Sequence, residues 1–459
     1  MFSRYINTAK RDLSRVAQIF LLRILGFALL RKNTRPTQFY FSLLKNSGVL
    51  TDHISHDSYE LSAAWEKTDK LWVEGKYNES VRERKIILGE LYKLNNVALV
   101  NYFPPTLSIG YLGPIGHQAM LGVHIAAQNL DILPKGTRTA MRVLKEEPKP
   151  LLDVFQPFLN YVNYRNTPAW TELPNHWHAA ERLQLVRTHN GFIDLYELIE
   201  NVFTKSNPTP ENPLFKLDKN YIDYCQAELG KLGLKPNDWF VGLHIRNDGY
   251  VEARRNQPIE SYNQAIKEVL DRGGKVLRIG DSSMVPMSSQ PGLIDLVTEL
   301  NSRQDLHLYV LAKSLFFIGT SSGPSSVPAL FGVPTLITNT TSIGRNVLSA
   351  AVNSIYIPKL SVNYKGDICS FRASLSSQDA FGELELPALR ELGINLLPNS
   401  SEDIHAAVCE MFEKIEKRKI QSEAEYAFKI DKIRAEASWT SKGFFAVSFL
   451  EKYQKEFLE

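Results

Sequence analysis

Short, continuous apolar runs separated by glycine-rich turns dominate the second half of the chain. They lie at Trp239–Ile245, Lys275–Ile279 and Leu315–Ile318, and runs of this length are typical of parallel strands covered on both faces. Between them, Asp218–Leu232 and Glu260–Arg272 have the spacing and end signals of helices. Alternating strands and helices predict an α/β domain with a parallel sheet.

The clearest turn in this pattern lies within Leu315–Asn339, which predicts a strand, a glycine-serine turn, a short helix and a second strand. Ser321 or Ser322 can cap the helix, and Pro324 suits its first position. Gly332 can end it. Free amides and hydroxyls at a helix start bind anions, above all phosphates. The alternative is a tight turn in which the serines serve only as caps.

Two other strand ends carry charged side chains. Arg246 ends the first strand, and Asp281 follows the second. Because parallel strands end at one edge of a sheet, we expect both residues to meet the Ser321–Ser322 loop there and to form a nucleotide or nucleotide-sugar site. Arg246 can bind a phosphate bidentately, and Asp281 can bind ribose or base hydroxyls. The alternative partner of Arg246 is Asp248, in an ion pair.

The rest of the second half continues the same pattern. We expect a helix at Leu293–Glu299, a strand within Val352–Phe371 and a helix at Ser401–Lys417 that Ser401 opens. Glu423–Glu459 is expected to be largely helical and to cross back to the first domain.

The first half repeats the order of strand, glycine-rich loop and helix. Val97–Tyr102 predicts a strand, Ser108–His117 (SIGYLGPIGH) the loop and Gln118–Asn129 the helix. This order predicts a second α/β domain. The glycine spacing is not the dinucleotide-binding fingerprint, and no acidic residue follows at the expected distance.

Within this loop, Gly110, Gly113 and Gly116 allow the backbone to approach a ligand closely. His117 stands at the helix start. Its imidazole titrates near neutral pH and can act as a base, but a histidine there can equally be a cap or a structural donor.

The N-terminal segment has a different composition. Val16–Leu30 is apolar except for Gln18 and Arg23, and basic residues flank it on both sides. The run is too short and too interrupted to span a bilayer, so it predicts a helix that lies at an anionic membrane surface. The alternative is a helix docked on the protein itself. Residues 145–215 are expected to form irregular loops with short helices, and Lys205–Pro213 the linker between domains.

Composition narrows the class of protein. The 459 residues are 44% apolar and 22% charged, as in ordinary globular chains of two or three domains. A net charge of +3 is too small to indicate nucleic-acid binding. Three scattered cysteines fit no metal or redox spacing and indicate a reducing compartment. No D-x-D pair stands in a suitable position, so we expect neither a metal nor a cofactor.

These motifs together resemble a family. VGLHIRND, SYNQAIKEVLDRGGKVLRIGDSS and FFIGTSSGPSSVPALFGVPTLITN are similar to segments of bacterial glycosyltransferases of surface polysaccharide gene clusters, which resemble GT-B enzymes, including fucosyltransferases with an H-x-R element. The resemblance covers residues 236–345 and extends to 95–135. It implies an α/β fold with two Rossmann-like domains facing across a cleft (GT-B type), with added N-terminal helices, and the donor held mainly by the C-terminal domain.

The resemblance also implies roles for residues. His244 and Arg246 match H-x-R, so Arg246 would hold the donor diphosphate and stabilise the leaving nucleotide. With the residues singled out above, the expected substrate-binding set is His244, Arg246, Arg255, Asn256, Asp281, Ser282, Thr320, Ser321, Ser322, Gly323, Gly110, Gly113 and Gly116. The catalytic candidates are His117, Asp248 and Arg246.

The predicted function is therefore metal-independent transfer of a sugar from a nucleotide-sugar donor to a surface-polysaccharide or lipid-linked glycan acceptor. The expected location is the cytoplasm, at the surface of the inner membrane. Two alternatives stay open, a nucleotide-sugar epimerase and a non-catalytic nucleotide-binding scaffold. The expected parts are a membrane-interface helix (1–35), a helical hairpin (36–94), an acceptor domain (95–212), a donor domain (213–400) and C-terminal helices (401–459).

Overall fold

The computed structural model describes the C-terminal half of the chain most fully. The described residues are 115–133, 139–141, 150–155, 161–163, 186–188, 191–193, 195–247, 255–297, 303–341, 353–375, 393–417, 422–436 and 444–458, with isolated positions from 67 to 83 and at 351 and 389. The predicted membrane-interface helix and the strand at Val97–Tyr102 lie outside them, as does most of the predicted hairpin.

The chain divides into two compact units. The second consists of Pro114–Ala126, Pro148–Phe158 and Ile199–Glu459, and the first of the remaining residues. In the first unit, the described strands are a parallel pair, β1 (Thr139–Met141) with β2 (Tyr161–Asn163), and an antiparallel pair, β3 (Val186–Thr188) with β4 (Gly191–Ile193). The division into the five predicted parts, and the second Rossmann-like domain, stay predictions.

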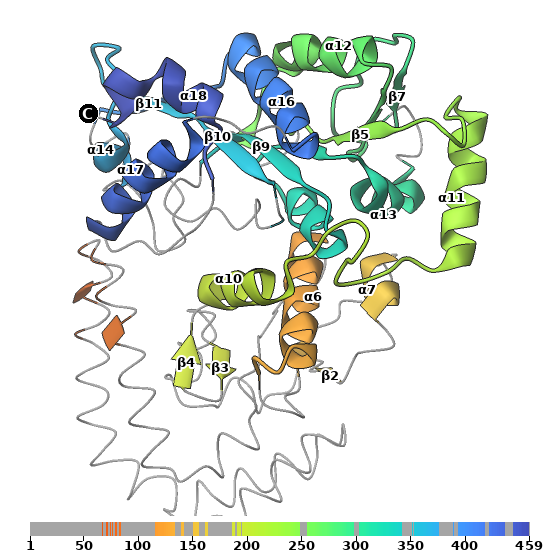
Figure 1. The fold of residues 1–459 in the computed structure, drawn as a ribbon, viewed down its shortest axis with the longest axis horizontal. Coiled ribbons are helices and arrows are strands. Elements are labelled where there is room, and N and C mark those ends of the chain that lie inside the picture. The colour runs from red at the N-terminus through yellow and green to blue at the C-terminus, as the bar shows by residue number, and fades with distance from the viewer. Residues whose placement is uncertain are drawn as a thin grey trace, which may run out of the picture. The chain divides into compact units, whose positions relative to one another are not determined.

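A six-stranded parallel sheet forms the centre of the second unit (Figure 1). Its order is β10-β9-β8-β5-β6-β7, and every neighbouring pair is parallel. The strands are β5 (Phe240–Leu243), β6 (Lys275–Arg278), β7 (Leu293–Asp295), β8 (Phe317–Gly319), β9 (Thr335–Thr340) and β10 (Ile355–Pro358). The prediction of an α/β unit with a parallel sheet is confirmed.

One strand of this sheet was expected to be a helix. The structure shows Leu293–Asp295 as edge strand β7, so the prediction of a helix at Leu293–Glu299 is wrong for these residues. A short apolar run is compatible with either structure. The tertiary contact decides here, because the Asp295 carboxylate pairs with the buried Arg278 guanidinium of the adjacent strand at 3.0 Å.

Helices cover both faces of the sheet (Figure 1), with α12 and α16 on one and α13 on the other. Two helices have residues in both units, α6 (Ile115–Asn129) and α10 (Leu195–Ser206). The other described helices and short turns belong to the second unit and are α7 (Pro150–Phe155), α11 (Lys219–Lys231), η3 (Ile259–Tyr262), α12 (Asn263–Asp271), α13 (Gln304–Lys313), η4 (Gly323–Ser326), η5 (Pro328–Phe331), α14 (Phe371–Leu375), α16 (Ser401–Ile415), α17 (Glu423–Glu436), α18 (Val447–Lys452) and η7 (Gln454–Leu458). A small antiparallel pair joins β11 (Leu360–Val362) to β12 (Asn395–Leu397).

Several predicted helices are confirmed. Helix α11 starts after Asp218, whose carboxylate accepts from the Asn220 and Tyr221 amides. Helix α16 forms as expected, but Ser400 rather than Ser401 is its cap and makes a capping box with Asp403. The region 145–215 contains a 12-residue helix, α10, which the expectation of loops and short helices did not include.

Aromatic side chains fill the core beside the sheet. The Phe316 ring, just before β8, packs edge to face against Phe412 of α16, with ring centroids 5.2 Å apart. The Trp239 ring packs against the same phenylalanine, with centroids 6.0 Å apart. Toward the C-terminus, the Phe445 ring packs against Tyr356 of β10 in a tilted arrangement, with ring centroids 4.3 Å apart. Thus α16 and the segment before α18 both pack onto the second unit's own sheet.

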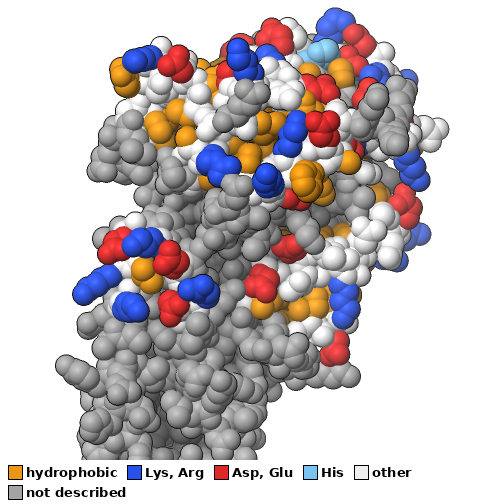
Figure 2. Space-filling view, turned by 60° about the vertical axis from the view of Figure 1, so that its left-hand side comes forward, with side chains coloured by type: hydrophobic (Ala, Val, Ile, Leu, Met, Phe, Trp, Pro, Cys, Tyr) orange, Lys and Arg blue, Asp and Glu red, His pale blue; other side chains and the backbone are white. Residues whose placement is uncertain are grey.

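Basic and acidic side chains are interspersed over the described part of the face in Figure 2. This mixture agrees with the small net charge of +3. Among the described residues, no helix is both long and apolar enough to cross a bilayer.

Candidate functional site

The strand order places a topological switch point between β5 and β8. The chain proceeds from β5 outward through β6 and β7 on one side, and from β8 through β9 to β10 on the other. Loops leaving β5 and β8 therefore run in opposite directions at the carboxyl edge, which is where sheets of this kind bind ligands. Arg246, Asp281 and Ser321 all follow strands that end at this edge. All three therefore lie at the same edge of the sheet, and their meeting in one site stays a prediction.

The loop after β8 is buried, and hydrogen bonds within the protein hold one of its serines. Thr320, Ser321 and Ser322 are buried. The short helix expected here forms as 3-10 turns. Ser322 stands at the start of the first, η4, without a capping hydrogen bond from its side chain. The Ser321 hydroxyl instead donates to Thr340 Oγ1 at 2.9 Å and accepts from the Thr341 amide at 3.3 Å.

The two prolines explain the correction. Gly323 starts η4, with Pro324 second rather than first as predicted, and Pro328 starts η5, so the segment forms two 3-10 turns and not one continuous helix. The second turn ends as predicted, because Gly332 has a left-handed φ of 70°.

The start of α6 packs directly against this loop. A Cβ atom built on Gly116 would lie 2.7 Å from Gly323 Cα. Both residues belong to the second unit. The contact brings the first turn of a 15-residue helix beside the glycine-serine loop. His117 lies in that first turn, and its side chain is outside the described residues, as are Gly110 and Gly113.

His244 lies inside the edge of the sheet. Its side chain is 2% exposed, and its backbone amide donates to Ile318 O at 2.9 Å. Burial lowers the pKa of the imidazole to about 3, and the positive charge of Arg246 acts in the same direction. The ring is therefore neutral at physiological pH and can donate or accept a hydrogen bond without carrying charge.

Arg246 is half-buried two residues beyond His244, and its carbonyl accepts from the Gln257 amide at 2.7 Å. This bond ties the end of β5 to the segment that carries the half-buried Arg255 and Asn256. Asp248 lies outside the described residues.

Asp281 and Ser282 are exposed beyond the end of β6. Asp281 Oδ1 accepts from the Ser283 amide at 2.9 Å and so closes its own turn. Its proposed contact with ribose or base hydroxyls stays a prediction.

Several buried polar atoms at this edge have no hydrogen-bond partner within the described part of the chain. They follow the ends of β5, β8 and β9 and are His244 Nδ1, Asn256 Oδ1, Thr320 Oγ1 and Thr341 Oγ1. A buried polar atom normally finds a partner, because leaving it unpaired costs about 1–3 kcal/mol. A polar ligand bound at the edge would satisfy them.

Two further cationic side chains, which are not among the predicted site residues, lie at the same edge. Arg278 ends β6 fully buried and donates to Asp295, to Val285 O at 2.9 Å and to Asn247 Oδ1 at 3.3 Å. Lys359 follows β10, is 6% exposed, and has its pKa lowered by burial to about 8. Lys359 follows an apolar run, as Arg246 does, so the sequence carries a signal for it. Arg278 lies inside a run, between Leu277 and Ile279, and the sequence carries no such signal for it.

Comparisons with known proteins give distant structural similarities only. No protein family model matches the sequence, and no curated protein matches it. Several solved structures are similar to this chain, among them the three that follow. The glycosyl transferase family 9 protein from Veillonella parvula shares 15% identity over 65% of this chain and 79% of its own, with a TM-score of 0.32.

The other two structures come from Escherichia coli. The ADP-heptose lipopolysaccharide heptosyltransferase II shares 15% identity over 53% of this chain and 72% of its own, with a TM-score of 0.29. The iron-containing dodecameric glycosyltransferase TibC, from an enterotoxigenic strain, shares 14% over 66% and 74%, with a TM-score of 0.36. At these scores the similarity assigns no activity to the chain.

Proposed function

We propose that the protein is a glycosyltransferase that moves a sugar from a nucleotide-sugar donor to a glycan or lipid-linked glycan acceptor. The observation that carries the proposal is a set of buried polar atoms that have no partner among the described residues and that lie beside a cation and a glycine-serine loop at the switch point of the parallel sheet. The diphosphate of a donor supplies negative charge and can accept from the Thr320 and Thr341 hydroxyls, and a sugar or ribose hydroxyl of the same donor can donate to Asn256 Oδ1. The resemblance of the three sequence segments to bacterial glycosyltransferases supports the same chemistry.

In this proposal Arg246 and the backbone amides at Ser321–Gly323 bind the diphosphate. An acceptor hydroxyl oxygen attacks the anomeric carbon, the bond from that carbon to the diphosphate breaks, and the nucleoside diphosphate leaves with the electron pair. Fixed cations and amides stabilise the charge that develops on the leaving group. His117 and Asp248 are the candidate bases for the hydroxyl proton. Fixed charge makes the proposed transfer independent of a divalent metal.

Nucleotide binding tests the proposal. Isothermal titration and thermal shift of the full chain with UDP, GDP, CMP, dTDP, ADP and their sugars, with and without chelator, should identify one nucleotide family that binds equally in both conditions. Arg246→Ala should weaken that binding at least tenfold. Arg372→Ala removes an exposed arginine of α14 and is the matched control. Equal affinity in Arg246→Ala and in the unaltered chain would contradict the site.

Glycosyl transfer needs a second test, because a nucleotide-binding scaffold or an epimerase would also bind. The nucleotide that binds identifies the donor class. With acceptor present, the matching nucleotide-sugar should transfer its sugar to the acceptor and release free nucleoside diphosphate. Conversion of the donor into another nucleotide-sugar would indicate an epimerase. Binding without any turnover would favour a scaffold.

Membrane attachment is a separate part of the proposal. Residues 1–35 are proposed to bring the protein to an anionic membrane surface, where a lipid-linked acceptor is available. Replacing Arg11 and Arg15 by glutamate should abolish flotation with vesicles that contain anionic lipid, without changing nucleotide affinity. Unchanged flotation would contradict this part alone.

A further inference from the structure

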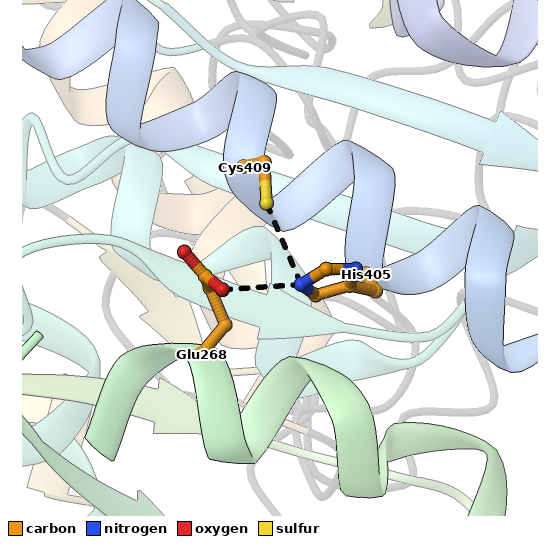
Figure 3. A group of neighbouring side chains, drawn as sticks. All are labelled: Glu268, His405 and Cys409. Atoms are coloured by element: carbon orange, nitrogen blue, oxygen red, sulfur yellow. Dashed lines mark hydrogen bonds and ion pairs between the residues drawn. The ribbon is translucent and has the colours of Figure 1, made fainter. Parts of the chain in front are cut away.

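Three side chains with metal-ligand atoms meet between two helices of the second unit (Figure 3). His405 and Cys409 are one turn apart on α16, so both lie on the same face of that helix. Glu268 comes from α12, which packs against α16. These helices cover a face of the sheet, whereas the proposed donor site lies at its carboxyl edge.

The ligand atoms already lie at distances that suit a shared metal ion. His405 Nε2 is 3.1 Å from Glu268 Oε2 and 3.6 Å from Cys409 Sγ, and all three ligand atoms lie within 4.8 Å of one another. Zinc bonds of about 2.0–2.3 Å in a tetrahedral arrangement place neighbouring ligand atoms about 3.3–3.6 Å apart. An ion can therefore enter with only small movements of these side chains.

Arg272 binds one carboxylate oxygen of Glu268 and leaves the other available to a metal ion. Its Nε donates to Glu268 Oε1 at 2.7 Å, whereas Oε2 faces His405. The guanidinium lies over the Phe412 ring at 4.3 Å, which fixes its position, and it also approaches Glu416 at 3.6 Å. An outer partner of this kind orients a metal-binding carboxylate.

The Cys409 thiol distinguishes this cluster from an ordinary histidine–glutamate hydrogen bond between two helices. A histidine–glutamate pair needs no sulfur, yet Cys409 Sγ approaches the same ring nitrogen. Sulfur, imidazole nitrogen and carboxylate oxygen are a ligand set that suits zinc, whereas magnesium and calcium take oxygen ligands. The His405 side chain is 37% exposed and that of Glu268 is 22% exposed, so an ion and a fourth ligand from solvent can reach the cluster.

We propose that Glu268, His405 and Cys409 bind a zinc ion that fastens α12 to α16. The site lies between helices that contact β6 and β9, so the ion would stabilise the unit that carries the proposed donor site. The proposal does not depend on that site, because none of its residues belongs to it.

The test uses the full chain, reduced and stripped with chelator, and titrated with Zn²⁺ or with Co²⁺ as a spectroscopic probe. One ion per chain should bind, the thermal midpoint should rise, and Co²⁺ should give a thiolate-to-metal absorption band that Zn²⁺ removes. Cys409→Ser should abolish the band, and His405→Gln and Glu268→Gln should each weaken Zn²⁺ binding at least tenfold. Cys369→Ser, which alters a half-buried cysteine outside the cluster, should bind as the unaltered chain does.

Circular dichroism separates lost binding from lost folding. Zn²⁺ binding is compared only for variants whose helical circular dichroism signal equals that of the unaltered chain. Glu268→Gln keeps the size of the side chain and is the variant that best preserves packing. No Zn²⁺ binding at micromolar concentrations would overturn the proposal. So would a Co²⁺ band that persists in Cys409→Ser.

Discussion

The backbones of Gly116 and Gly323 are in direct contact. A Cβ atom on Gly116 would lie 2.7 Å from Gly323 Cα, and one on Gly323 would lie 2.9 Å from Gly116 N. Real Cβ atoms do not approach backbone atoms so closely, so neither position has room for a side chain. The first turn of α6 and the start of η4 therefore meet through two glycines that lie far apart in the sequence.

Gly116→Ala should destabilise the second unit. The added methyl group meets backbone atoms, which cannot move aside as a flexible side chain can, and overpacking of this kind costs about 1–3 kcal/mol. Urea unfolding measures the change in the free energy of unfolding. Gly230→Ala is the control, because Gly230 lies in α11 with nothing within 4 Å of the new Cβ. The control should be as stable as the unaltered chain or slightly more so. Equal stability of both variants would show that the two loops separate readily.

Asp295→Asn should be strongly destabilising. Arg278 is fully buried, and the Asp295 carboxylate is its charged partner at 3.0 Å. Asp295 also accepts from the Met287 amide at 2.7 Å and from the Val297 amide at 3.0 Å. Removing one charge of a buried pair leaves the other uncompensated and costs about 3–5 kcal/mol.

An exposed ion pair provides the control for this loss. Lys267 and Asp271 pair one turn apart on α12 with both side chains exposed. Lys267→Ala should change the free energy of unfolding by less than about 1 kcal/mol. Similar losses in the two variants, measured by urea unfolding, would contradict the importance of burial.

Acid should destabilise the fold through two buried histidines. Burial lowers the pKa of His124 to about 4 and that of His244 to about 3. Between these values and the ordinary histidine pKa of about 6.5, the unfolded chain binds protons that the folded chain does not. Stability therefore falls as pH decreases through this window, by up to about 1.4 kcal/mol per pH unit for each histidine.

His124→Gln isolates one of these contributions. The stability difference between this variant and the unaltered chain should move in favour of the variant as pH falls from 8 to 5. Urea unfolding at both pH values measures it. A difference independent of pH would mean that His124 titrates alike in the folded and unfolded chains.

Glu410→Ala should loosen the C-terminal helices. The buried carboxylate of Glu410, on α16, accepts from the Val447 amide at 3.0 Å and from the Ser448 amide at 2.9 Å, at the start of α18. Burial raises the pKa of this carboxyl group. Without the Glu410 carboxylate, these buried amides have lost their acceptor, and each one should lower the free energy of unfolding by about 1–3 kcal/mol.

Glu456→Ala is the control for that loss, because Glu456 is an exposed glutamate near the C-terminus. Limited proteolysis measures the opening of α18. Cleavage within residues 437–458 should accelerate in Glu410→Ala and stay unchanged in Glu456→Ala. Equal cleavage rates would show that the carboxylate does not hold α18.

Local patterns predicted much of the second unit and part of its candidate site. The apolar runs ending at Ile245, Ile279 and Ile318 identified three central strands, and Gly332 marked the end of a turn, because burial on both faces and a left-handed φ each leave a direct trace in the residue types. Parallel pairing then brings the ends of these strands to one edge. Arg246 and the glycine-serine loop could be placed there from the sequence for this reason.

Other features depend on partners that are distant in the sequence. Leu293–Asp295 is a strand because β6 and the Arg278 guanidinium lie beside it, and a short apolar run does not record that neighbour. Gly116 meets Gly323, and Glu268 meets His405, across separations that no local spacing encodes. Apolar periodicity and turn chemistry are therefore determined by the sequence itself. The tertiary structure decides which buried charges pair and which ligand atoms converge, because long-range contacts depend on the path of the whole chain.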